Sequence, residues 1–338
     1  MFYTLDDSIR LSRQFGKRPR EFVSDELRGW RWNEPPLLSD SPTRLSVSDV
    51  ASGICPTGRD VFNKSVSHVR PGDNPSMHLG LLVHITYETA VRTAKKLIYS
   101  GINKSSDFID AMRNEGERNI ALTRRLRRWS IAEDDFQSIY WSLWDQATST
   151  YSGALGKART LSKYATLESL AGAVIPINVE FMIDGSLIGL TKAIRIDGVL
   201  LPFIPIELKT GPPSEWHRVA LAGYALAMES QWETPVDFGV LIYVDFQDGD
   251  LYIREEEVAI GDELRMDFIH ERDRRASIAE KGVDPGMPDK CNTWCPYLEY
   301  CGQQKNLGGG RVGIGVKIEK RDDNSNGPRR RRGQEGAG

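Results

Sequence analysis

Ile206-Glu207-Leu208-Lys209-Thr210-Gly211 decides the predicted fold, together with Arg195-Ile196-Asp197-Gly198 shortly before it. Both stretches have the β-branched residues and the glycine punctuation that are typical of strands. Nine residues separate Asp197 from Glu207, which is enough for a hairpin or a short crossover. If the two strands are neighbours in one sheet, their carboxylates converge.

An aspartate on one strand and a Glu-x-Lys on the next can hold a divalent metal and a water. Asp197 and Glu207 offer the hard oxygen ligands that Mg²⁺ and Mn²⁺ prefer. Because side chains alternate along a strand, Lys209 shares a face with Glu207 and can orient or deprotonate the attacking water. The metal would stabilise charge on a scissile phosphate. The alternative is a strand that ends in a solvent-facing Glu-x-Lys pair.

Polar side chains on two predicted helices can join this site. His84 precedes Glu88 by four residues on one helical face, so its imidazole can complete a Mn²⁺ site while Glu88 orients it. Tyr224 follows His217 by seven residues, or two turns, so both face the same way and can contact a DNA phosphate or position the lysine. The alternative for each is ordinary packing of a helix.

The four cysteines of the chain suggest one metal site. Cys291, Cys295 and Cys301 lie close together, whereas Cys55 lies far upstream. Four thiolates are the number that a tetrahedral zinc or an iron–sulfur cluster needs, and the gaps of the trio fit no common zinc-finger spacing. The pattern predicts a clasp that joins the two ends of the chain. Zinc in place of iron, and buried cysteines with no shared role, are the alternatives.

Hydrophobic periodicity and turn residues predict an α/β protein. A helix is expected to begin at Ser46 or Ser48 and to bring Cys55 to its C-terminal end. Other helices are predicted at 77–100, 105–128, 132–152, 214–230 and 260–282. Strands are predicted at 175–183, 189–197, 203–209, 236–245 and 251–258, with a hairpin turn at 247–250.

The chain of 338 residues divides into five predicted parts. These are an extended N-terminal arm at 1–43 that packs its tryptophans on the body, a helical region at 44–160 with Cys55 and His84, a nuclease core at 161–258, a helix with the cysteine cluster at 259–306, and a disordered tail at 307–338. The sequence has no apolar stretch long enough for a membrane span and no signal peptide, so we expect a cytoplasmic protein.

Overall charge gives the chain no general attraction to nucleic acid. Its net charge is −3, with 40% hydrophobic and 27% charged residues, which argues against a protein that coats DNA. An enzyme can still bind DNA through a local basic surface. Candidate surfaces are Lys17–Arg20, Arg124–Arg128 and Arg329–Arg332, and a solvated helix face is the alternative for each.

The order of these motifs resembles the RecB-like exonucleases with an iron–sulfur staple. It is most similar to the CRISPR-associated adaptation nucleases of the Cas-four type, particularly their archaeal Csa branch. Further stretches that support this branch are Glu26–Trp30 with Glu34–Pro36, His217–Tyr224 and Asp284–Gly286. The resemblance covers residues 25 to 303, although Ala220 stands where the family often has glutamine.

The resemblance implies a PD-(D/E)xK restriction-endonuclease-like core with a mixed central sheet, a helical insertion and iron–sulfur-clasped termini. It implies a [4Fe–4S] cluster and a Mn²⁺ or Mg²⁺ site; the cluster ligands would be Cys55, Cys291, Cys295 and Cys301. The metal ligands would be His84, Asp197 and Glu207, with Lys209 catalytic and Tyr224 in the last motif.

The activity implied is trimming of single-stranded DNA ends for spacer acquisition, with the CRISPR integrase and other adaptation proteins as partners. A second hypothesis from a different class is a non-catalytic iron–sulfur scaffold that holds DNA or recruits the integrase. The set of Asp197, Glu207 and Lys209 favours the enzyme.

Overall fold

The computed structural model describes residues 1–17, 23–73, 75–247 and 249–307. The chain divides into two compact units, Met1–Glu299 and Tyr300–Gly338. The helix α10 (Leu298–Leu307) ends the described part. The predicted disordered tail after Leu307 lies outside the described residues. The basic run at 329–332 and most of the run at 17–20 lie outside them as well.

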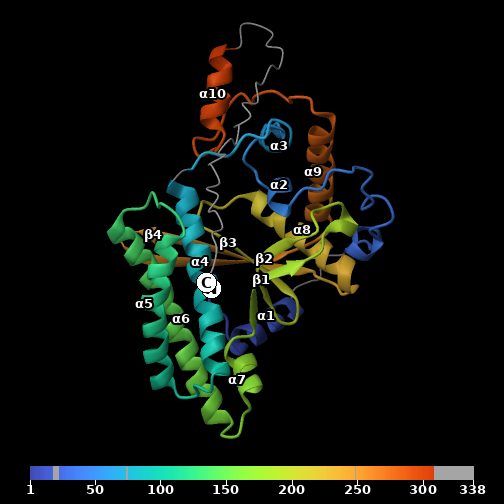
Figure 1. Cartoon of the computed structure of the whole chain (residues 1–338). Coiled ribbons are helices and arrows are strands. Elements are labelled where there is room, and N and C mark those ends of the chain that lie inside the picture. Colours follow the sequence, from blue (N-terminus) through green and yellow to red (C-terminus); the bar gives the residue numbers. More distant parts are fainter. Residues whose placement is uncertain (18–22, 74, 248, 308–338) are drawn as a thin grey trace, which may run out of the picture. The chain divides into compact units, whose positions relative to one another are not determined.

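A five-stranded mixed sheet forms the centre of the first unit (Figure 1). Its strands follow the order of the sequence: β1 (Ile177–Ile183), β2 (Ile194–Leu200), β3 (Ile204–Lys209), β4 (Phe238–Gln247) and β5 (Asp250–Ala259). β3 and β4 are parallel and joined by the helix α8 (Glu215–Trp232), whereas all other neighbours are antiparallel. The mixed sheet is confirmed, and each predicted strand overlaps an observed one.

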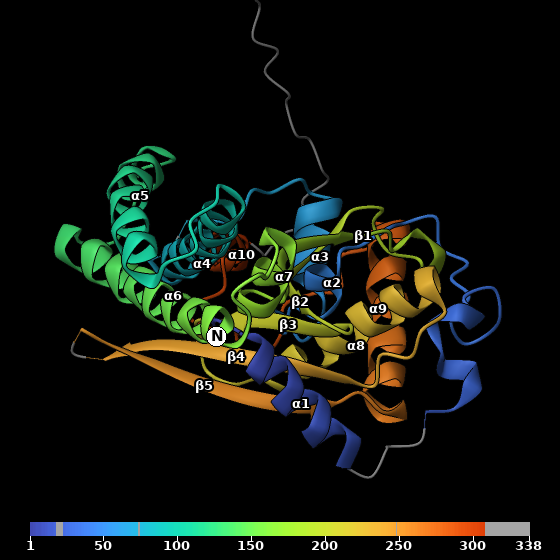
Figure 2. The same ribbon diagram turned by 90° about the horizontal axis from the view of Figure 1, so that it is seen from below.

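Helices cover both faces of the sheet (Figure 2). One buried apolar cluster joins α4 (Pro75–Tyr99), α5 (Ser105–Arg125), α6 (Glu133–Leu161) and α7 (Leu167–Val174) to Ile206 and Leu208 of β3. The other joins α8 and α9 (Asp262–Lys281) to Leu241 and Tyr243 of β4. Because side chains alternate along a strand, Glu207 and Lys209 of β3 share the α8 face with their pairing partners Leu241 and Tyr243. Among the described helices, none is long and apolar enough to cross a membrane.

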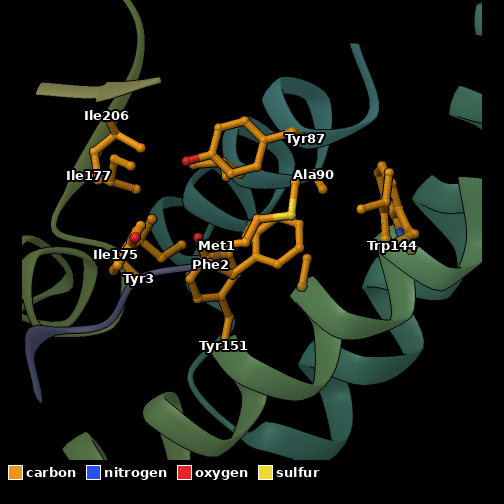
Figure 3. Packing of buried hydrophobic residues seen from close by; sticks show 14 of the residues in the cluster. Met1, Phe2, Tyr3, Tyr87, Ala90, Trp144, Tyr151, Ile175, Ile177 and Ile206 are labelled. Carbon is orange, nitrogen blue, oxygen red and sulfur yellow. The ribbon is translucent and has the colours of Figure 1, made fainter. Parts of the chain in front are cut away.

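The N-terminal segment is not the extended arm that its arginine, tryptophan and proline content predicts. It forms the helix α1 (Leu5–Lys17) and two 3₁₀ turns, Asp25–Leu27 and Gly29–Arg31. Residues 1–3 pack in the first cluster beside Tyr87 and Tyr151 (Figure 3), and the amino group of Met1 lies 3.0 Å from Glu255 Oε1. Trp32 stays 36% exposed, whereas Trp30 is half-buried on the turn that contacts α8.

Two other boundaries differ from the prediction. Ser46 caps α2 (Val47–Val50) as expected, but this helix ends at Val50, and Gly53 further along adopts a left-handed backbone at φ +59° that is incompatible with one helix reaching Cys55. Cys55 therefore lies in a loop before α3 (Arg59–Ser65). β2 begins at Ile194 rather than at 189, because Ser186–Ile188 forms a 3₁₀ turn and Leu190 pairs with Leu45 instead.

Candidate active site

The site lies where β2 and β3 separate. The ladder between them ends at the pair Gly198 and Ile206, and one further step would place Asp197 opposite Glu207. Instead, Asp197 Oδ2 accepts a hydrogen bond from the Leu208 backbone N–H at 2.7 Å. A side-chain hydrogen bond thus takes the place of the next backbone hydrogen bond between β2 and β3. The carboxylates of Asp197 and Glu207 both lie at this opening between the two strands.

His84 reaches this opening from α4. Its Nδ1 lies 3.1 Å from Asp197 Oδ1, and the imidazole is about one-third exposed. Gly80, one turn earlier, lets α4 approach β3 closely, because a Cβ there would lie 3.2 Å from Thr210 Oγ1. The predicted union of His84 and Asp197 is present in the structure, and Gly80 explains how the helix comes near enough.

Glu207 is buried, with 6% of its surface exposed, and its two oxygens differ. Oε1 accepts a hydrogen bond from Lys209 Nζ at 2.6 Å. Oε2 is buried without a hydrogen-bond partner among the described residues. A buried carboxylate oxygen in this state is unusual, because buried polar atoms almost always find a partner.

The charges of the site are strongly coupled. Burial alone would raise the pKa of Asp197, but the charge and hydrogen bond of His84 lower it more. Burial, together with the negative charge of Asp197, raises the pKa of Glu207 against the opposing effect of Lys209. Burial would lower the pKa values of His84 and Lys209, yet the carboxylates raise both. The site therefore holds two carboxylates against two nitrogen bases.

α8 contributes Tyr224 and His217 to the same region. Burial, followed by the charges of Glu207 and Asp197, raises the pKa of the Tyr224 hydroxyl. His217 Nδ1 lies 3.2 Å from the Tyr243 hydroxyl, and burial and the charge of Lys209 lower its pKa to about 4. Both residues act on the Glu207–Lys209 pair, in agreement with the predicted shared face. Glu88, the predicted orienting group of His84, instead pairs with Arg92 at 2.9 Å.

Glu180 of β1 is a neighbour of the site that the sequence analysis missed. The pairs Val179–Gly198 and Phe181–Ile196 flank it, so it lies opposite Asp197. Its φ of +48° is a left-handed conformation that is strained for a glutamate. The sequence offers no local signal for it, because its relation to Asp197 depends on the register of β1 and β2.

The donor atoms of these residues suit a divalent metal, but their side chains are paired with one another. No three His, Cys, Asp or Glu side chains within residues 1–17, 23–73, 75–247 and 249–307 are grouped so that they could hold an ion. His84 is occupied by Asp197, and one oxygen of Glu207 by Lys209. The metal site therefore stays a prediction, supported by an imidazole, two carboxylates and a buried oxygen without a described partner.

The loops that carry three of the cysteines are joined by polar contacts. Asn292 Nδ2 donates to the carbonyl oxygen of Ile54 at 3.0 Å, and Arg59 pairs with Asp284 at 2.7 Å. None of the four cysteines forms a disulfide within the described part of the chain. The Cys55 loop and the segment of Cys291 and Cys295 thus meet, as the clasp requires. Cys301 belongs to the second unit, and its grouping with the others stays a prediction.

The predicted basic surface at Arg124–Arg128 is partly neutralised. Arg124 pairs with Glu133, and Arg127 Nη2 lies 2.8 Å from Asp73 Oδ1. Arg125 and Arg128 are exposed. This surface offers less positive charge than the sequence suggests.

The fold and the site define an α/β protein with a histidine, two carboxylates and a lysine where two central strands part. The family model described as CRISPR-associated exonuclease Csa1 matches residues 1–304. A CRISPR-associated exonuclease Csa1 from Saccharolobus solfataricus is 36% identical over 304 residues, which are 89% of this chain and 99% of that protein. Another from Thermoproteus tenax is 30% identical over 279 residues, 82% and 91% of the two chains. This chain belongs to the family of CRISPR-associated exonucleases Csa1.

The resemblance to the Csa branch is thereby confirmed. A solved structure described as "Crystal structure of SSO0001" covers 51% of this chain and 85% of its own, at 19% identity. Its TM-score of 0.23 is too low to bear on the fold. The PD-(D/E)xK assignment of the core, the divalent metal and the iron–sulfur cluster stay predictions.

Proposed function

We propose that this chain is a metal-dependent exonuclease that acts on single-stranded DNA ends and trims fragments for CRISPR spacer acquisition. Membership of the family supports a CRISPR-associated nuclease. The observation that carries the catalytic part is the Glu207 oxygen that is buried without a described partner, beside Lys209, Asp197 and His84. The grouping of two carboxylates with an imidazole and a lysine at one buried position supports an enzyme over a scaffold.

His84, Asp197 and Glu207 would hold Mn²⁺ or Mg²⁺, since one imidazole and two carboxylates suit either ion. The bound ion would supply positive charge to the scissile phosphate and lower the pKa of the attacking water. Lys209 would donate a hydrogen bond to that water or to a phosphate oxygen. Asp197, held by the Leu208 N–H, keeps its second oxygen directed toward His84.

Glu207→Gln tests this function, because it keeps the size of the side chain and removes its charge. We expect at least a hundredfold loss of cleavage of end-labelled single strands with Mn²⁺, with unchanged thermal stability. Glu117→Gln, the same change at an exposed position on α5, is the matched control and should cleave as the wild type does. Equal cleavage by Glu207→Gln and the wild type would place the active site elsewhere, and a wild type that binds DNA without cutting it would support the scaffold.

The proposed cofactor of the cysteines is a [4Fe–4S] cluster on Cys55, Cys291, Cys295 and Cys301. The contact between the Cys55 loop and the Asn292 segment supports it, because three of the thiols then lie on joined loops. The proposed partners are the CRISPR integrase and other adaptation proteins, as the resemblance to adaptation nucleases implies.

Cys55→Ser should lose the iron and the brown colour of anaerobically purified protein, because thiolate ligation contributes directly to folding. We expect the segment after Asp284 to become sensitive to protease as well. Truncation after Leu307 keeps all four cysteines and is the control. Full iron content in Cys55→Ser would show that Cys55 is not a ligand. Colourless wild-type protein with stoichiometric zinc would show that the site holds zinc and not an iron–sulfur cluster.

A further inference from the structure

We infer that a pocket beside Lys209 is a subsite that holds one nucleobase of the DNA strand next to the scissile phosphate. This inference rests on the proposed function. The pocket has a volume of about 600 Å³ and begins at Thr210 and Gly211, directly after the catalytic lysine. That volume is in the range of pockets that bind small ligands.

The pocket continues the catalytic face of the sheet. Lys209 pairs with Tyr243 of β4, and Tyr243 pairs in turn with Arg254 of β5. Directly paired residues point to the same face, and neighbouring strands lie about 4.8 Å apart. Arg254 therefore lies on the same face as Lys209, two strand spacings or roughly 10 Å away, within reach of a DNA strand that leaves the site.

The lining of the pocket suits a flat ring. Tyr252 is 51% exposed, and Pro212 and Pro213 also line the pocket. The guanidinium of Arg254 lies over the ring of Tyr243, with its carbon 4.7 Å from the ring centroid. Bases of single-stranded nucleic acids stack on aromatic rings and on arginine planes without regard to sequence.

Tyr243 is a rigid support for this arrangement. It is buried in the core cluster under α8, and its hydroxyl lies 3.2 Å from His217 Nδ1. Arg254 is thereby supported on one side by a fixed ring, while 58% of its side chain is exposed. The surface for stacking is present before any ligand binds, which lowers the entropy lost on binding.

Charge distinguishes the two ends of the pocket. Arg254 lies at the end near Lys209 and offers its guanidinium to a phosphate. Its acidic neighbour Glu256, 3.8 Å away, is bonded more closely by Arg218 at 2.6 Å. At the other end Asp245 lies opposite Tyr252 and would repel a phosphate. Its oxygens accept from the Phe246 N–H and the Gln247 amide, and each keeps a lone pair that can accept from the amino group of a base. The phosphate is therefore assigned to Arg254 and the base to Tyr252.

Binding of single-stranded oligonucleotides that carry one abasic position tests the subsite. The abasic position is moved stepwise from the end, and affinity is measured by fluorescence anisotropy without added divalent metal. We expect one position to weaken binding to the wild type about tenfold, because one base–aromatic contact is lost. Tyr252→Ala should bind the intact strand with the weaker affinity that the wild type shows for that abasic strand. Its affinity should not fall further when the base at that position is removed. Tyr164→Ala, at a tyrosine that is 90% exposed in the α6–α7 loop, is the control and should keep the wild-type pattern.

The result has separate consequences for the subsite and for the nuclease. Equal sensitivity of Tyr252→Ala and the wild type to every abasic position, or sensitivity of neither, would overturn the subsite, whether or not the wild type cleaves DNA. Cleavage of the same labelled strands with Mn²⁺ is scored independently, so absence of cleavage would overturn the proposed function instead. Arg254→Gln provides a second measure, since loss of one phosphate contact should reduce the slope of log affinity against log salt by about 0.7.

Discussion

Two buried glutamates of this chain, Glu229 and Glu207, are in opposite states. Glu229 is fully buried at the end of α8, and both of its oxygens are bonded: Oε1 accepts from Arg28, Val236 and Arg265, and Oε2 from Gly29 and Arg265. Glu207 Oε1 accepts a hydrogen bond from Lys209, and the Tyr224 hydroxyl is a hydrogen-bonding neighbour of the same carboxylate, while Oε2 is buried with no described partner in full hydrogen-bond geometry.

The difference separates a structural cluster from the candidate catalytic one. Around Glu229, Arg265 also donates to the carbonyl oxygens of Leu27, Val236 and Ile260, so the network ties the N-terminal turns to α8 and α9. Such a network specifies a fold when all of its members are bonded. The Glu207 cluster keeps two carboxylates close together at the cost of stability, which is typical of a site that binds a cation.

The largest expected effect is on the structural cluster. Glu229→Ala would leave Arg265 as a buried cation without its main partner, and we expect a loss of about 3–5 kcal/mol in the free energy of unfolding. Urea denaturation measures it. The companion variant Glu207→Gln should lose less than about 0.5 kcal/mol while it loses cleavage. Glu229→Ala with wild-type stability would remove the distinction between the clusters.

Two glycines sharpen the same comparison. A Cβ on Gly29 would lie 2.1 Å from the carbonyl oxygen of Leu226, whereas one on Gly80 would lie 3.2 Å from the Thr210 hydroxyl. Gly29→Ala must displace backbone, so we expect about 1–3 kcal/mol of destabilisation. Gly80→Ala should keep the melting temperature within a few degrees but lower cleavage about tenfold, because α4 and His84 shift away from Asp197. A larger stability loss in Gly80→Ala than in Gly29→Ala would contradict this assignment.

Much of the functional site could be predicted from the sequence, whereas the structural cluster could not. Asp197, Glu207 and Lys209 lie on strands whose apolar alternation and short connection are local signals, and the spacing of His217 and Tyr224 is a helical one. The bonds of Glu229 join residues about 200 positions apart, so no local pattern reveals them. Glu180 was missed for the same reason, since only strand register brings it opposite Asp197.

Local averaging caused the other errors. The first 43 residues are rich in arginine, tryptophan and proline as a whole, and this composition concealed the helical spacing of Leu11 and Phe15, which α1 buries. The helix predicted to bring Cys55 to its end would have to pass through Gly53, whose left-handed backbone is incompatible with a continuous helix. In both cases single residues carry a signal that the broader pattern does not.

A further expected effect is the pH dependence that His217 adds beside the candidate site. Burial and the charge of Lys209 lower its pKa to about 4, against an ordinary value near 6.5 in the unfolded chain. Between these values the unfolded chain binds a proton that the folded chain does not, so stability is present above pH 6.5 and is lost as the pH falls toward 4. His217→Gln should reduce the fall of the melting temperature over that window, whereas His270→Gln, at an exposed position on α9, should leave it unchanged. Identical profiles for His217→Gln and the wild type would show that the imidazole is protonated alike in both states, and that the charge of Lys209 does not reach it.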